Sequence, residues 1–503
     1  MRKPVIVFLF LFVVALFLHN ARGEELENRV VRHAFKNGLV LLMVERHIAP
    51  TVSFQITYKA GSVNEYPGIT GIAHLYEHMA FKGTEKVGTR DFKAERPVLA
   101  ALDKAFGELK LEREQGKEGN PKRIDEHEKE MADLEKKEAS YSMPNEVGEI
   151  YRRNGATGLN ANTGKDFTNY VVSLPSNRLP LWIALESDRM THPVLREFYK
   201  EKQVVLEERR MRTENSPAGK LYEALMRTAF WIHPYGLPVI GWSQDVQSLS
   251  RKQTEDFFKV YYGINNIVIA IVGDIHPDQV VAEMEKTFGR IPPQPLPPPV
   301  PFVEPPQEGE RRVHVDFPAN PLLFVGYHRP AVDDPDDVIF DIIDSLLSDG
   351  RTSRLYKHLV TEKEIAQSIG TDASTPGGRY PSLFLIEGEP RAPHTLDELE
   401  KAIDQEISVL KSEPVGAREF QKLKNQFDGS LIRALESNSG LAGQLAYFEA
   451  LTGDWKSLLK QRKEMEHIKP EDIMRVAKRY FVENNRVVAT LSGPALTPAR
   501  KSE

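Results

Sequence analysis

The stretch LSRKQTEDFFKVYYGINNIVIAIVG, residues 249–273, decides how the chain is divided. Its pattern predicts a capped amphipathic helix, a turn that contains asparagine, and a buried strand. The stretch IKPEDIMRVAKRYFVENNRVVATLSG, residues 468–493, has the same order of features, with Tyr480 in the place of Tyr261 and an Asn-Asn pair in register. A chance match of two common helix–strand units is the alternative, but it would not preserve both features. We therefore expect an internal repeat of about 220 residues and two domains of like fold.

A proline-rich segment separates the two copies. The sequence GRIPPQPLPPPVPFVEPPQEGERR, residues 289–312, contains too many prolines for regular hydrogen-bonded structure and predicts a semi-rigid extended linker. The N-terminal domain is then expected at 24–288 and the homologous C-terminal domain at 313–503. The expected fold class is α+β, with a sheet covered by helices in each domain.

A charged segment, residues 92–144, interrupts the first domain. Apolar residues recur there at helical spacing, the sequence GKEGNP breaks the pattern, and a weaker helical pattern follows. We expect a helical hairpin inserted into the domain. Its alternating charges are typical of a solvated face, with a binding surface as the alternative.

The N-terminus predicts export. Residues 1–23 begin with Arg2 and Lys3, continue with an apolar run from Val5 to Leu18, and end in an Ala-x-Gly pattern. This is typical of a secretory signal peptide, and the expected location is the periplasm. Secretion, or anchoring by an uncleaved signal, is the alternative. No later segment approaches transmembrane length, so stable membrane insertion after signal cleavage is not expected.

Composition narrows the function. The net charge of -6 gives no electrostatic reason to expect nucleic acid as a partner. The chain has no cysteine, so disulfides are excluded and any metal must be bound by carboxylates or by the 14 histidines.

The stretch GITGIAHLYEHMAFKGT, residues 68–84, is the strongest candidate metal site. Two glycines at the start and KGT at the end predict one short helix. His74 and His78, four residues apart on that helix, direct their imidazoles at one point, and Glu77 lies at the same edge. This inverted order, His-x-x-Glu-His, predicts a zinc peptidase. Zinc would acidify a water molecule and polarise the scissile carbonyl, and Glu77 would be the general base and not a ligand.

A third ligand is expected from REFYKEKQVVLEERRMR, residues 196–212. Glu201 and Glu208 are seven apart and share a helix face with Val204 and Val205, whereas Glu207 is turned by about 100° from Glu208. We assign Glu208 to zinc and expect Glu201 to orient a ligand histidine. Without the upstream motif, the same segment would be interpreted as a charged surface helix.

These two segments resemble the metal-binding segments of the pitrilysin/insulinase family of zinc peptidases, and most closely its bacterial members that are similar to mitochondrial processing peptidases. The similarity extends over nearly everything after the signal peptide except the hairpin. LNANTGKDFTNY (159–170) looks like the family's active-site edge strand. HPYGLPVIG (233–241) looks like the loop before the last helices of the first domain, and DGRTSRLYKHLVTEKEIAQS (349–368) like the corresponding start of the second.

The resemblance implies a clamshell of two facing domains, one zinc ion per chain in the first, and an extended peptide between them. Asn160 and Ala161 would then pair with the substrate backbone, which adds a strand to the sheet. The alternative for Asn160 is a turn residue before that strand.

Two features depart from the family pattern. The spacing from His78 to Glu208 is long, and removing the hairpin restores it. Active members also often have an Arg and, seven residues later, a Tyr in the second domain, where this chain has Val360 and Gln367. Neither replaces those donors, because valine donates nothing and glutamine lacks an acidic phenol. We therefore expect a homologous partner chain that supplies the Arg/Tyr pair, or a homodimer.

The function expected is zinc-dependent hydrolysis of peptide bonds in small or unfolded polypeptides, as an endopeptidase or oligopeptidase. The alternative is a peptide-binding subunit of a heteromeric peptidase with little activity alone. A purely structural metal site is disfavoured, because such sites normally have four protein ligands and this sequence offers three.

Overall fold

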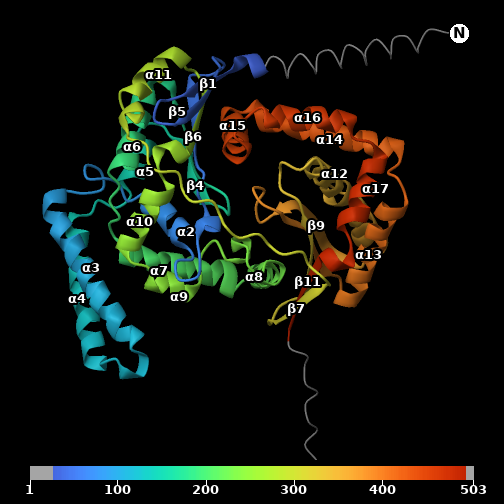
Figure 1. The fold of residues 1–503 in the computed structure, drawn as a ribbon, viewed down its shortest axis with the longest axis horizontal. Helices are drawn as coiled ribbons and strands as arrows, with labels where there is room; N and C mark the ends of the chain where they lie inside the picture. The colour runs from blue at the N-terminus through green and yellow to red at the C-terminus, as the bar shows by residue number, and fades with distance from the viewer. Residues whose placement is uncertain (1–25, 494–503) are drawn as a thin grey trace, which may run out of the picture.

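The computed structural model describes residues 26–493, so the predicted signal peptide at 1–23 lies outside the described residues. Two mixed sheets form two lobes, each with its own helices (Figure 1). The first sheet has the order β1-β2-β6-β3-β5-β4 and the second β7-β11-β8-β10-β9. The first-domain strands are β1 Val30–Ala34, β2 Val40–Glu45, β3 Thr51–Tyr58, β4 Thr157–Thr163, β5 Thr168–Pro175 and β6 Ile267–Gly273. The second-domain strands are β7 Arg311–Asp316, β8 Leu322–Arg329, β9 Ala366–Thr375, β10 Ser382–Pro390 and β11 Arg486–Ser492.

The two sheets are copies of one arrangement. In each, one pair of neighbouring strands is parallel, β2 with β6 and β7 with β11, and the strands that follow in the sheet are antiparallel. β1 is an extra strand in the first. The asparagines of the sequence repeat make equivalent bonds: Asn266 Nδ2 donates to the Tyr261 carbonyl at 2.8 Å, and Asn485 Nδ2 donates to the Tyr480 carbonyl at 2.8 Å. The expected α+β fold of two homologous domains is confirmed.

Helices cover both sheets. The first domain contains α2 Ile72–Met79, α3 Phe92–Glu114, α4 Pro121–Tyr141, α5 Glu146–Arg153, α6 Leu179–Thr191, α7 Phe198–Arg209, α8 Pro217–Ala229, α9 Ser243–Ser248, α10 Arg251–Tyr261 and α11 Pro277–Glu285. The second contains α12 Asp337–Ser348, α13 Leu396–Ser412, α14 Ala417–Glu436, α15 Asn438–Thr452, α16 Ser457–His467 and α17 Pro470–Tyr480. Within residues 26–493, no helix combines the length and the apolar character needed to cross a membrane.

Each domain also covers the sheet of the other. Leu441, Leu445 and Ala446 of α15 pack on the face of the first sheet formed by β2 and β6. Reciprocally, Leu221 and Leu225 of α8 pack on β8, β10 and β11 of the second sheet. Every residue of β6 is buried, as expected for a strand with both faces covered. The clamshell is therefore joined by two exchanged helices (Figure 1).

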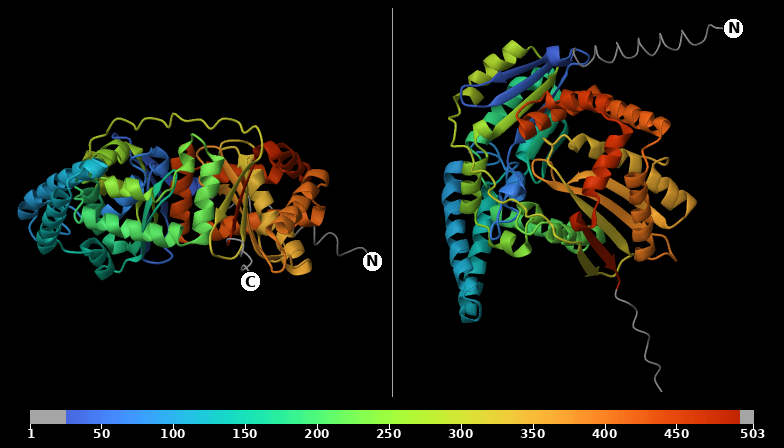
Figure 2. Two further views of the ribbon diagram at one scale, coloured as in Figure 1. Left: turned by 90° about the horizontal axis from the view of Figure 1, so that it is seen from below. Right: turned by 45° about the vertical axis from the view of Figure 1, so that its right-hand side comes forward.

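The linker between the domains and the inserted helical hairpin are both seen in the structure. Residues 291–310 contain no helix or strand and run along one side of the molecule between the lobes (Figure 2). β7 begins at Arg311, inside the segment predicted as linker, because it pairs with Val487 of β11. The helices α3 and α4 form a long hairpin that projects from the first lobe (Figure 1). The break between them lies at the sequence GKEGNP.

Candidate metal centre

The helix α2 is fixed at its start by close backbone packing. Gly71 precedes it with φ of 86°, and a Cβ there would lie 2.7 Å from the Ile240 carbonyl oxygen. The buried Glu65 carboxylate accepts from the Gly71 and Ala73 N–H groups at 2.8 and 2.9 Å, and burial raises the pKa of Glu65 to about 8. These contacts satisfy amide groups that have no acceptor within the helix. They set the direction in which the two histidines point.

The structure brings together His74, His78 and Glu208. The Nε2 atoms of His74 and His78 lie 3.7 and 3.4 Å from Oε2 of Glu208. Zinc bonds of about 2.0 to 2.2 Å in a tetrahedral arrangement separate neighbouring ligand atoms by about 3.4 Å. The three side chains therefore fit one zinc ion, with the fourth position left for water or substrate.

The two histidines differ in pKa. Burial lowers the pKa of His74 to about 4, so its imidazole is neutral and has a free lone pair. Burial opposes protonation of His78 as well, but hydrogen bonds with Glu201 and Glu208 raise its pKa to about 9. A metal ion would therefore have to displace a proton from His78.

The two glutamates on α7 have different contacts. Oε1 of Glu208 lies 2.9 Å from Arg212, which leaves Oε2 directed at the histidines. Glu201 accepts from Nδ1 of His78 at 2.9 Å, and its other oxygen lies 2.6 Å from Nζ of Lys82. Glu207 is 55% exposed and pairs with Arg210. The structure thus places Glu201 behind a candidate ligand and turns Glu207 away from the site.

The face of α7 that carries Glu201 and Glu208 lies at the border of the buried side of the helix. Val204 is 46% exposed, whereas Val205 is fully buried. The buried stripe of α7 passes through Val205 and Leu206, so Val204 does not belong to the face that turns toward the core.

Glu77 lies beside the three candidate metal ligands and is not one of them. Its Oε2 accepts a hydrogen bond of 2.6 Å from Oγ1 of Thr163, and burial raises its pKa. Thr163 is the last residue of β4, the edge strand of the first sheet. Asn160 and Ala161 pair with Val171 and Tyr170 in the middle of β4, so Asn160 is a strand residue and not a turn before it. The unpaired edge of β4 therefore leads to Glu77.

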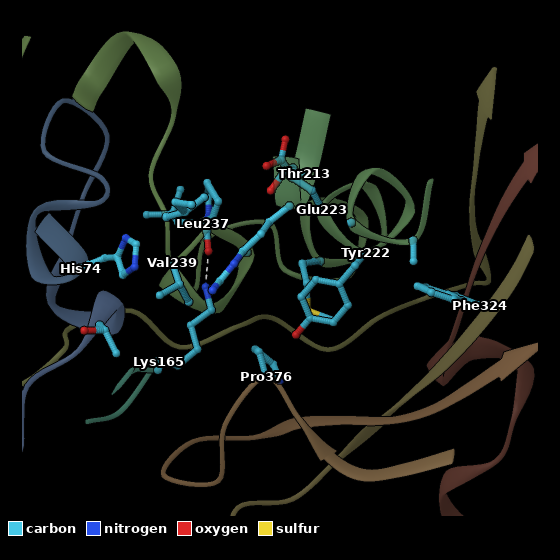
Figure 3. A pocket seen from close by; sticks show the side chains of 18 of the residues that line it. His74, Lys165, Thr213, Tyr222, Glu223, Leu237, Val239, Phe324 and Pro376 are labelled. Atoms are coloured by element: carbon cyan, nitrogen blue, oxygen red, sulfur yellow. Dashed lines mark hydrogen bonds between the residues drawn. The ribbon is translucent and has the colours of Figure 1, made fainter. Parts of the chain in front are cut away.

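A cavity of about 480 Å³ opens beside His74 and Thr163, between the two domains. Figure 3 shows its walls, with Lys165 hydrogen-bonded to the Leu237 carbonyl, Tyr222 from α8, and Phe324 and Pro376 from the second domain.

The two positions where the family often has an Arg and a Tyr lie away from this cavity. Val360 packs against the core of the second domain and Gln367 is exposed, and neither lines the cavity.

Three residues of the site were not predicted from the sequence: Thr163, Lys82 and Arg212. Arg212 follows Glu208 by four residues and pairs with it, so helical spacing was an available signal for Arg212. Lys82 lies beyond the end of α2 and pairs with Glu197 and Glu201, which its spacing from His78 does not indicate. Thr163 lay in the edge-strand motif without an assigned role.

The chain matches two models of one family. The model described as Insulinase (Peptidase family M16) matches residues 40–106 and 136–242, and the Peptidase M16 inactive domain matches 248–427. The zinc protease PqqE of Helicobacter pylori is 28% identical over 464 residues, which cover 91% of each chain. A probable mitochondrial-processing peptidase subunit beta of Arabidopsis thaliana is 22% identical, over 95% of this chain and 80% of the relative. A solved protease from Helicobacter pylori superposes with a TM-score of 0.77 at 27% identity, covering 92% and 99% of the two chains.

The protein belongs to the insulinase, or pitrilysin, family of metallopeptidases, as the resemblance indicated. Relatives of this length are named zinc proteases. The family model leaves residues 107–135 unmatched, which is most of the hairpin.

Proposed function

We propose that this chain is a zinc endopeptidase or oligopeptidase in which Glu77 is the general base. The observation that carries this proposal is the position of Glu77, which is buried beside the ligand set, separate from it, and hydrogen-bonded to the edge strand at Thr163. A zinc ion bound by His74, His78 and Glu208 would acidify a water molecule and polarise the scissile carbonyl. The raised pKa of Glu77 suits a group that accepts a proton from that water and then donates it to the leaving amine.

The substrate backbone would pair with β4. A peptide that extends the sheet at Asn160 and Ala161 passes beside Thr163 and brings a carbonyl next to Glu77. Recognition through the backbone requires an extended peptide and makes few demands on sequence. Small or unfolded polypeptides are therefore the proposed substrates.

Contacts between the domains restrict entry to this site. Asp166, directly after the β4 end of the site, accepts from the Gly378 and Arg379 N–H groups of the second domain at 3.0 and 3.1 Å. Tyr235 also donates to Asp166 at 2.7 Å. A folded protein would have to break these bonds to reach the cavity, whereas a short peptide fits a cavity of about 480 Å³.

A second candidate function is a peptide-binding subunit that needs a homologous partner. Val360 and Gln367 favour it, since the second domain brings neither an Arg nor a Tyr from these positions to the cavity. The similarity to a chain named a processing-peptidase subunit agrees with this function.

Export to the periplasm is proposed from the apolar run after Arg2 and Lys3. N-terminal sequencing of the mature protein would test it, and the expected first residue is the one that follows Gly23.

The test measures hydrolysis of an unstructured fluorogenic peptide by the purified full chain, together with its zinc content. The peptidase proposal expects turnover that chelation abolishes and that Glu77→Gln abolishes without loss of zinc. Turnover in Glu77→Gln equal to wild type would refute the base. If the wild-type chain binds zinc and peptide but turns over only after a chain with the Arg/Tyr pair is added, the second candidate is correct.

A further inference from the structure

The helical hairpin contains a second group of side chains arranged like metal ligands. Glu108 lies on α3, and His127 and Glu130 lie three residues apart on α4, facing it. Nδ1 of His127 is 3.6 Å from Oε2 of Glu108 and 3.7 Å from Oε2 of Glu130. These separations are too long for hydrogen bonds and match those of two ligands that share one ion.

Similar separations occur at the candidate catalytic site, where the histidine nitrogens lie 3.4 and 3.7 Å from Oε2 of Glu208. In both clusters the two oxygens of one carboxylate have different partners. Oε1 of Glu208 faces Arg212, and Oε1 of Glu108 faces Nζ of Lys104 at 3.8 Å, so in each case the second oxygen is directed at imidazole nitrogen.

The buried Nδ1 of His127 supplies an independent reason to expect a ligand. It is shielded from solvent and has no hydrogen-bond partner among the described residues. An unsatisfied buried nitrogen of this kind is unfavourable, because it has lost its hydrogen bonds to water without gaining others. A divalent cation between His127 and the two carboxylates would satisfy it and neutralise their charge.

A third cluster, on the first-domain surface, provides a contrast. His47 lies 2.5 Å from a Glu45 oxygen and 2.6 Å from an Asp274 oxygen. Its two ring nitrogens are thus already hydrogen-bonded to carboxylates, and both bonds and the carboxylates raise the pKa of His47. A protonated His47 that donates from both ring nitrogens explains this cluster without a metal ion.

We propose that Glu108, His127 and Glu130 bind a second zinc ion that joins α3 to α4. One imidazole and two carboxylates suit zinc, with water completing the coordination on the exposed side, where Glu130 is 54% exposed. All three residues lie within 107–135, the segment that the family model does not match. The site therefore belongs to the insertion and joins its two helices, with one ligand from α3 and two from α4.

The test is the zinc stoichiometry of the full chain after dialysis against zinc chloride and gel filtration. Wild type should retain two zinc ions and Glu208→Gln, which removes a catalytic-site ligand, should retain one. Adding His127→Ala or Glu130→Gln to Glu208→Gln should abolish the remaining ion. Two control variants, His47→Ala and His192→Ala, should not change the count.

Amide hydrogen exchange separates a metal ion that bridges the two helices from adventitious surface binding. Zinc should slow exchange in α3 and α4 of the Glu208→Gln protein, and this protection should disappear in Glu208→Gln/Glu130→Gln, whose second substitution is exposed and leaves the fold intact. The proposal is overturned if Glu208→Gln retains no zinc, or if the retained zinc survives both hairpin substitutions or follows His47.

Discussion

Removing the Glu201 carboxylate should weaken zinc binding although Glu201 is not a ligand. Its side chain is 13% exposed, accepts from Nδ1 of His78 at 2.9 Å and pairs with Lys82 at 2.6 Å. In Glu201→Ala the imidazole loses the partner that fixes its orientation, and Lys82 retains only Glu197, at 3.2 Å. A hydrogen bond to a charged group contributes about 1.5 to 3 kcal/mol. We therefore expect zinc affinity to fall by about 10- to 100-fold, the usual effect of removing a partner of a ligand histidine.

The assay is competition for zinc with a chromophoric chelator, with circular dichroism to verify folding. Glu201→Gln retains an oxygen that accepts from His78 and should lose less affinity than Glu201→Ala. The matched control is Glu207→Ala on the same helix, where the side chain is 55% exposed and pairs only at the surface. Equal zinc affinities for Glu201→Ala and Glu207→Ala would refute the reasoning.

Three further predictions follow from the site and the domain contact. Glu77→Gln should lower kcat/KM by about 10²- to 10⁴-fold with unchanged zinc content by elemental analysis, and zinc loss would contradict its role as a base outside the ligand set. Glu208→Gln should lose the catalytic zinc while Glu207→Gln retains it, and the reverse result would exclude the assigned ligand. His233 is 4% exposed at the contact with Tyr380 of the second domain, and burial lowers its pKa to about 4. Because the unfolded state takes up this proton near pH 6.5, stability should fall as pH drops from 6.5 to 4. The urea midpoint of His233→Asn should fall less over that range, and an equal fall would refute the assignment.

Local features of the site were predictable because they depend on helical periodicity. His74, His78 and Glu77 occupy one short helix, and the seven-residue spacing of Glu201 and Glu208 places them on one side of another. Thr163 could not be assigned in this way, because its contact with Glu77 joins residues 86 apart through a β-strand register that the sequence does not specify.

The exchange of helices between the domains could not be predicted from the sequence either. The fully apolar strand β6 indicates that both faces of the first sheet are covered, but not that α15 of the other domain supplies one cover. An apolar helix face specifies burial and leaves its partner open, since the hydrophobic effect is not directional.

The internal repeat explains why, within residues 26–493, the second domain has no metal site of this kind. The offset of 219 residues between Asn266 and Asn485 places Phe420 and Phe427 of α14 at the positions of Glu201 and Glu208. Both phenylalanines pack against the core of the second domain, so the equivalent positions there carry core side chains in place of carboxylates. The second domain contributes Phe324, Pro376 and Glu387 to the cavity lining, and none of the three is a cationic donor. Among the described residues that line this cavity, the cationic donors Arg212 and Lys165 come from the first domain, so we expect the donor for the substrate carbonyl to be one of them or to come from a partner chain. Arg212→Ala separates these origins: a large fall in kcat with retained zinc and no response to a partner would place the donor in this chain.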